Sequence, residues 1–176
     1  MAVASFQPAA VVYREEQNFD WRAYALVFAV EVLWGVLLWK LKRAADPAAL
    51  LHLDAIEVPV GIAIFMALPV VIIVGFLRMT TEVTPTDLRV WFGWVPTYRR
   101  AIDAGMVRRA EVVTYRPWAD CRGWGVRTGR DGERVLNARG NRGVRLELSD
   151  GSLLVIGSQR PEDLARAITT ALQPPT

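Results

Sequence analysis

Two long apolar runs stand near the start of the chain, and short alternating runs follow them. Residues 58–77 are twenty consecutive positions without a charged side chain. At about 1.5 Å per residue, a helix of that length spans ~30 Å, the thickness of the hydrocarbon core of a bilayer. A second run, residues 23–39, contains one charge, Glu31, and is bracketed by aromatic and cationic side chains. The pattern predicts transmembrane helices at about 22–41 and 58–77, which form a hairpin over residues 21–78.

Cationic side chains mark the ends of both predicted helices, where long cations reach the headgroup layer. The candidates for contact with lipid headgroups are Arg22, Lys40, Lys42, Arg43 and Arg78. Because residues 40–57 are a short connection, the helices must run antiparallel, and both termini then share one side of the membrane. Positive charges flank the helices on both sides, so they do not decide which side that is.

Glu31 lies near the middle of the first predicted span. An ionised carboxylate there costs several kcal/mol, which predicts a protonated side chain or one that faces a polar partner. The second span offers no charged group to pair with it. Three interpretations stay open: a neutral glutamic acid bonded to a nearby backbone carbonyl, a contact with another subunit, and a proton relay, which would need a further titratable group.

From residue 79 the period of the pattern becomes that of strands. Strands are predicted at residues 80–83, 88–92, 98–102, 110–115, 124–127, 134–137, 144–148 and 153–156, which are rich in β-branched and aromatic residues. Asp-Gly pairs at 131–132 and 150–151 are typical of tight hairpins. Residues 161–172 predict an amphipathic helix, because Leu164, Ile168 and Leu172 recur every four residues after Pro161. The predicted fold class is an α+β membrane protein whose residues 79–176 form an antiparallel β-barrel or sandwich with a C-terminal capping helix.

Four short motifs stand out in this β region. TEVTPTDLRV at 81–90 directly follows the two helices, and GWGVR at 123–127, GVRLELSDG at 143–151 and IGSQRP at 156–161 lie farther on. This arrangement resembles membrane-anchored bacterial proteins with a pleckstrin-homology-like (PH-like) domain, and the resemblance covers residues 23–172. It implies a cytoplasmic β module with a capping helix and implies no reaction. Residues 1–20 have no counterpart in that family and are predicted to be an extended arm that lies on a neighbour.

The formal net charge differs between the two parts of the chain that meet at the end of the second predicted helix. Residues 78–176 contain 16 Arg, no Lys and 11 acidic residues, a formal charge of +5, whereas the first 77 residues balance to −2. A basic domain beside a bilayer can meet anionic headgroups or an acidic protein surface, and a merely well-solvated surface is the alternative. Nucleic acid is not an expected partner, because the arginines are spread along the sequence and interleaved with acids.

No group of residues has the pattern of an active site. The single cysteine, Cys121, has no histidine in its part of the chain, and the single histidine, His52, lies between the predicted helices. The glycine-rich segments 123–125 and 140–143 lack the Lys-Ser/Thr of a phosphate loop and predict turns. We therefore expect no catalytic, metal-ligating or cofactor-binding residue, no small-molecule substrate and no enzymatic activity.

Tryptophan is frequent, with seven residues in the chain. Exposed Trp beside Arg is typical of protein interfaces, although Trp in the β region also fits core packing. The candidates for partner contact are Glu31, Trp34, Trp39, Phe6, Tyr13, Trp91, Trp94, Trp118 and Trp124.

These observations favour a non-catalytic accessory subunit that docks on and stabilises a larger integral membrane complex, for which a photosynthetic or respiratory assembly is a possible host. Its expected partners are other integral membrane subunits and lipids. The expected location is the inner (cytoplasmic) membrane, crossed more than once, with both termini and the β domain in the cytoplasm. The alternative is a free-standing, membrane-anchored lipid or signal sensor.

Overall fold

The computed structural model describes residues 10–45, 57–94 and 96–172, and over these the chain is an α+β protein with two β-sheets. The first sheet has the strand order β1 (Tyr13–Asn18), β2 (Arg78–Val83), β3 (Asp87–Phe92) and β4 (Tyr98–Asp103). The second has the order β5 (Val107–Thr114), β8 (Arg142–Leu148), β9 (Leu153–Gly157), β7 (Arg134–Asn137) and β6 (Gly125–Thr128). The helices are α1 (Trp21–Ala45), α2 (Glu57–Phe76), α3 (Pro117–Cys121) and α4 (Pro161–Leu172), with a 3-10 turn η2 at Ala104–Met106.

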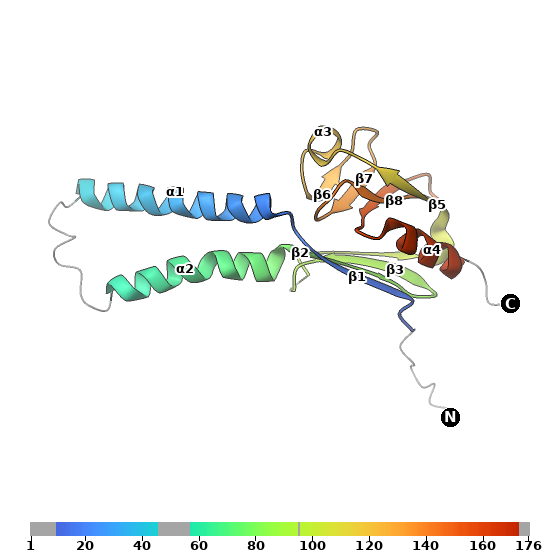
Figure 1. Ribbon diagram of the computed structural model, residues 1–176, viewed down its shortest axis with the longest axis horizontal. Coiled ribbons are helices and arrows are strands. Elements are labelled where there is room, and N and C mark those ends of the chain that lie inside the picture. Colours follow the sequence, from blue (N-terminus) through green and yellow to red (C-terminus); the bar gives the residue numbers. More distant parts are fainter. Residues whose placement is uncertain (1–9, 46–56, 95, 173–176) are drawn as a thin grey trace, which may run out of the picture.

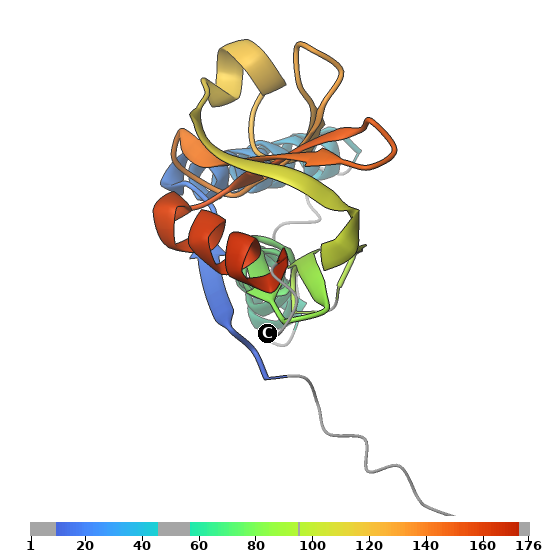
Figure 2. The ribbon, with the colours of Figure 1, turned by 90° about the vertical axis from the view of Figure 1, so that its right-hand side faces the viewer.

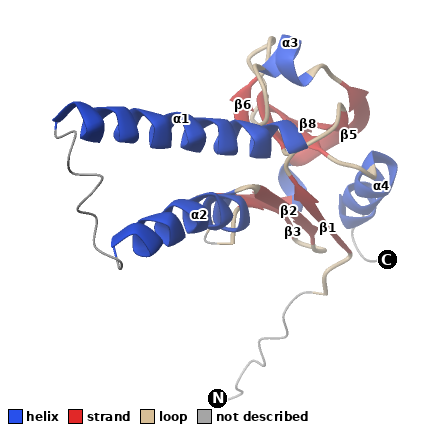
Figure 3. Ribbon diagram, turned by 60° about the vertical axis from the view of Figure 1, so that its left-hand side comes forward, coloured by secondary structure: helices blue, strands red, loops and turns tan. Residues whose placement is uncertain are grey.

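Helices α1 and α2 project from one end of the β region, side by side and in opposite directions (Figures 1 and 3). They approach closely at Gly35, where an added Cβ would lie 2.9 Å from the Phe65 ring. Among the described residues, one helix is long and apolar enough to cross a membrane: Trp21–Leu41, of 21 residues. In α2 the corresponding apolar segment is shorter, Ala67–Phe76.

Strand β1 ties the start of α1 to the end of α2. It pairs antiparallel with β2, from Tyr13 opposite Val83 to Asn18 opposite Arg78. Across this pair, Arg14 binds Glu82 at 2.8 Å and Arg78 binds Glu16. Residues 13–18 of the predicted arm are extended, and they pair with β2 as the edge strand of the chain's own sheet.

The two sheets and α4 enclose the main hydrophobic core, and Cys121, Val135 and Val155 form a smaller cluster. Helix α4 packs against β5 and β8 of one sheet and β2 of the other (Figure 2, red). The largest side chains of this core that are fully buried are Met79, Leu136, Leu146, Leu148, Leu154, Ile156 and Leu164. Their burial follows from alternation: Val144, Leu146 and Leu148 point inward on β8.

Both predicted Asp-Gly hairpins are present, and Gly132 and Gly151 each have φ +80°. The prediction of purely antiparallel strands is wrong at one place, because β7 pairs with β9 in parallel. The short helix α3 and the turn η2 were not predicted.

Candidate interaction site between the paired helices

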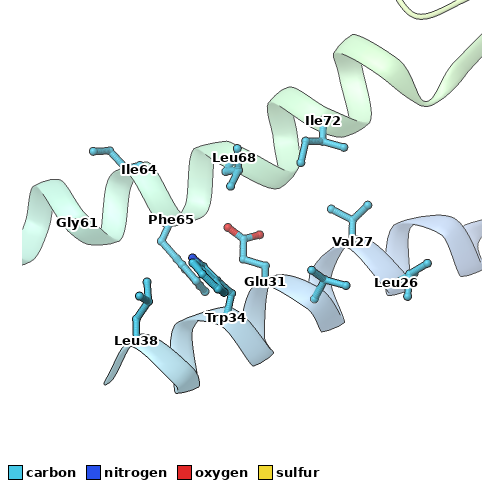
Figure 4. A pocket seen from close by; sticks show the side chains of 11 residues that line it. Leu26, Val27, Glu31, Trp34, Leu38, Gly61, Ile64, Phe65, Leu68 and Ile72 are labelled. Atoms are coloured by element: carbon cyan, nitrogen blue, oxygen red, sulfur yellow. The ribbon is translucent and has the colours of Figure 1, made fainter. Parts of the chain in front are cut away.

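Glu31 lies in the middle of α1 and is buried, with 8% of its surface exposed. In Figure 4 its carboxyl group points across the helix pair toward α2. Its Oε1 atom makes no hydrogen bond within the described part of the chain. The predicted bond to a backbone carbonyl is therefore not seen for this oxygen, and the side chain keeps an unused hydrogen-bonding position.

The surroundings of Glu31 are a partly open, apolar groove between α1 and α2, with a volume of about 540 Å³. Among the described side chains, Glu31 is the one charged group of its wall, which is otherwise lined by Leu26, Val27, Val30, Trp34, Leu38, Gly61, Ile64, Phe65, Leu68 and Ile72 (Figure 4). A polar group enclosed by apolar side chains loses its bonds to water and gains stability from any donor or acceptor that reaches it. Because the groove is partly open, a side chain from outside this chain can reach Glu31.

The opposite face of α1 carries a second, shallower apolar groove. It is lined by Ala25, Phe28, Ala29, Val32, Leu33 and Val36. Small residues four apart, here Ala25 and Ala29, let another helix approach closely in a membrane. The side chain of Ala63 on α2, which shares such spacing with Ala67, lies outside the described residues.

The other predicted contact residues of the helices do not converge on Glu31, except Trp34. Trp34 lines the same groove and is 56% exposed. Trp39 lies farther along α1, exposed, with the Arg43 guanidinium 5.3 Å from its ring centre. Phe6 lies outside the described residues.

The tryptophans of the β region divide into exposed and packed residues. Trp94 and Trp118 are exposed, whereas Trp91 and Trp124 are partly buried. Trp124 packs edge-on against Trp118, with ring centres 5.1 Å apart.

The predicted headgroup residues lie at the ends of the helices. Arg22 stacks near the Trp21 ring at the start of α1, at 5.9 Å, and Lys40 is exposed toward its other end. Arg78 follows α2 and pairs with Glu16. The side chain of Lys42 is not among those described.

Sequence reasoning missed a buried polar cluster that fastens β1 to the segment before α4. Glu15, only 6% exposed, accepts hydrogen bonds from the Tyr13 hydroxyl (2.7 Å), the Ser158 hydroxyl (2.6 Å) and the Gln159 backbone N–H (2.8 Å). Tyr13 thus points inward, and its predicted role in partner contact does not fit its burial. Burial, helped by the bond to Glu15, raises the pKa of Tyr13 to about 12. No clear signal for this cluster exists in the sequence, because the buried positions of Tyr13–Asn18 include Glu15 and Gln17 and so show no apolar alternation.

A second buried hydroxyl, that of Tyr115, predicts a loss of stability in alkaline solution. It faces Gly157 and Asn137, and burial raises its pKa to about 12. Since the folded chain favours the neutral phenol, this stabilisation is complete below pH ~10 and is lost as pH rises through the folded pKa. We expect the free energy of unfolding to fall by about 2 kcal/mol between these limits on account of Tyr115. Urea unfolding across this pH range checks it, and Tyr115→Phe should remove that part of the dependence. An equal dependence in wild type and Tyr115→Phe would contradict the assignment.

Nothing in the described residues resembles a metal centre or a nucleophile site. Groups of three or more His, Cys, Asp or Glu that could hold a metal ion are not found in the ranges that the structure covers. Cys121 is 2% exposed, and burial raises the pKa of its thiol, which disfavours the reactive thiolate. No family model, curated protein or solved structure matches the chain.

Proposed function

We propose that this protein is a non-catalytic accessory subunit of a larger integral membrane complex. Helices α1 and α2 cross the bilayer as an antiparallel pair and dock on transmembrane helices of the host. The observation that carries the proposal is Glu31, a buried carboxyl with an unpartnered oxygen in an otherwise apolar groove.

Membrane insertion is supported by the surface of the helix pair. Large apolar side chains are widely exposed on both helices, for example Leu33 at 69%, Leu26 at 64% and Val71 at 58%. An apolar surface of this extent is unfavourable in water and favourable in hydrocarbon. In α2 the absence of charge over residues 58–77 supports a second span.

Glu31 supports docking rather than anchoring alone. A single-pass or two-pass anchor gains nothing from an acidic residue at mid-span, because its insertion costs free energy. The cost is offset when a hydrogen-bond donor on a neighbouring helix fills the groove and reaches Oε1. Serine, threonine, asparagine, arginine or lysine on the host helix would serve.

The β region is proposed to be the PH-like module on the cytoplasmic face. Two sheets closed by one C-terminal helix support this assignment, together with the sequence resemblance. In this arrangement β1 and β2 hold the two spans at a set separation, so the module and the helices dock as one unit. A photosynthetic or respiratory assembly is the proposed class of host.

The test is purification of the tagged full chain from its own membranes, followed by native mass spectrometry. We expect co-purifying integral membrane subunits for the wild type and a roughly tenfold loss of them for Glu31→Leu, because one interhelical hydrogen bond contributes about 1–2 kcal/mol. Glu31→Gln should retain more, since an amide still offers an acceptor and donors.

The matched control is Leu37→Ala, an exposed apolar residue of α1 that lines neither groove. It should co-purify like the wild type. A wild-type chain that is monodisperse and alone in native membranes would overturn the proposal.

A further inference from the structure

Three arginines converge on a polar hollow at one corner of the β region. The hollow, of about 550 Å³, lies between α3 and the start of the turn that joins β6 to β7. Arg122, Arg127 and Arg130 line it, with Asp120 as the one acidic side chain of the lining. Three guanidinium groups against one carboxylate make it a positively charged concavity.

The arginines of the hollow are free to bind an anion. None of the three lies within ion-pair distance of a carboxylate in the residues that the structure covers, unlike Arg89, which binds Asp87. Asp120 is itself engaged, since it accepts the Arg116 backbone N–H at 2.7 Å. A guanidinium can give two parallel hydrogen bonds to a phosphate, so three around one hollow suit a phosphate group.

Local structure holds these side chains around the hollow. The Nε atom of Arg127 donates to the Trp124 carbonyl at 2.9 Å, which restrains the side chain and leaves its two terminal NH₂ groups for a ligand. Arg122 ends α3 in the left-handed conformation, with φ 59°, the single non-glycine residue with positive φ in the described ranges. The edge-on packing of Trp118 against Trp124 also holds α3 against the residues that precede β6.

Two of the elements that frame the hollow, α3 and β6, lie toward the end of the β region from which the helices extend. Figures 1 and 3 show them near the start of α1, whereas α4 lies away from it. Exposed tryptophans occur at the same end: Trp118 on α3 (59%), Trp21 at the start of α1 (69%) and Trp94 (79%). Trp94 belongs to the turn after β3, and its backbone N–H donates to the Gly75 carbonyl of α2 at 2.9 Å. Tryptophan beside the end of a transmembrane helix favours the headgroup layer of a bilayer.

We infer that the hollow of Arg122, Arg127 and Arg130 binds the phosphate of an anionic phospholipid headgroup and holds the β region against the membrane surface. This inference rests on the membrane insertion of the proposed function, but it concerns a lipid and needs no protein partner. It adds a third point of attachment beside the two helices, which limits rotation of the β region about them.

The test places a fluorophore beside the hollow of the full chain in lipid nanodiscs. Cys121→Ser removes the single cysteine, and Ala119→Cys provides an exposed labelling position on α3. Thr169→Cys on α4 is the matched position away from the membrane. We expect headgroup-spin-labelled phosphatidylglycerol to quench the label at 119 several-fold more than spin-labelled phosphatidylcholine, and to leave the label at 169 unaffected.

Variants that remove charge then test whether the preference for the anionic lipid depends on the arginines of the hollow. Combined Arg122→Gln, Arg127→Gln and Arg130→Gln should abolish the preference for the anionic lipid. Combined Arg108→Gln, Arg109→Gln and Arg166→Gln removes the same charge from exposed positions that do not line the hollow and should leave the preference unchanged. Equal preference in both triple variants, or equal quenching at 119 and 169, overturns the inference.

Two further measurements distinguish a failure of the lipid site from a failure of the proposed membrane insertion. If millimolar inorganic phosphate removes the preference while chloride at equal ionic strength does not, the hollow binds free phosphate and the lipid assignment is overturned. Extraction of the chain by alkaline carbonate would instead overturn the membrane insertion on which the proposed function rests. A chain that resists extraction but shows no quenching at 119 contradicts the lipid site alone.

Discussion

Glu15→Ala is expected to lower the free energy of unfolding of the β region by about 3–5 kcal/mol, because it leaves several buried donors without an acceptor. The Tyr13 hydroxyl, the Ser158 hydroxyl and the Gln159 N–H all donate to this one carboxyl group. Ser158 is 1% exposed, so water cannot replace the lost bond without opening the structure. Urea unfolding of the full chain in detergent, followed by circular dichroism, measures the change.

In Glu15→Ala, strand β1 should be destabilised more than the rest of the β region. Besides its pairing with β2, this edge strand is fastened to the segment 157–160 through Glu15, Gln17 and Arg160. Amide hydrogen exchange of residues 13–18 should therefore accelerate more in Glu15→Ala than exchange in β8. Glu15→Gln should cost less, since its amide keeps one acceptor oxygen and the hydroxyls can reorient.

Glu16→Ala is the matched control for Glu15, because it lies on the same strand and faces outward. Glu16 pairs with Arg14 and Arg78 at the surface, and such exposed pairs contribute less than about 1 kcal/mol. Equal losses for the two variants would contradict the role assigned to the buried cluster.

The elements predicted correctly are those whose signal is local. Helix α4 spans the expected residues, 161–172, because a first-turn proline and an apolar four-residue period lie within twelve positions. The Asp-Gly hairpins likewise need only their own flanking strands. Helices α1 and α2 were predicted from long apolar runs, of which the first contains one charge, and their ends differ from the prediction by four residues at most.

The missed features depend on residues that are far apart in sequence. Strand β1 pairs with β2 across the whole of both helices, and its inward side chains find partners such as Ser158, 143 positions away. A strand that buries Glu15 and Gln17 has no apolar alternation to reveal it. The parallel pairing of β7 with β9 is also non-local, since β8 intervenes between them in sequence.

The candidate site was predictable in part. Glu31 stood out as the one charge within an apolar run, and that alone identified it as a functional candidate. Its direction toward α2 depends on the rotation of α1 within the pair, which the close approach at Gly35 and Phe65 helps to set. The arginine hollow was not predicted, although its lining residues all lie within residues 119–130, because no sequence pattern indicated the short helix α3 that brings Arg122 toward Arg127 and Arg130.

Gly143→Ala is expected to destabilise the β region by about 3 kcal/mol or more, because the new methyl group meets backbone atoms that cannot move aside. A Cβ at Gly143 would lie 2.3 Å from the Ile156 carbonyl oxygen and 3.0 Å from the Gly157 Cα. Gly143 lies opposite Gly157 on β9 and opposite Val113 on β5, so its strand has a neighbour on each side. Either β8 and β9 separate here, which breaks ladder bonds beside the core, or the backbone of Gly143 distorts.

Gly75→Ala in α2 is the control for Gly143→Ala, since nothing lies within 4 Å of an added Cβ there and alanine is the better helix former. It should leave the urea midpoint unchanged or raise it slightly, whereas Gly143→Ala lowers it. Val144 and Leu146, which come after Gly143 on β8, are buried in the core. Gly143→Ala should therefore also accelerate hydrogen exchange in β9 and β5, the two strands that pair with β8. Similar midpoints for the two variants would mean that β8 and β9 have room for a side chain between them, which contradicts the close pairing of the two glycines.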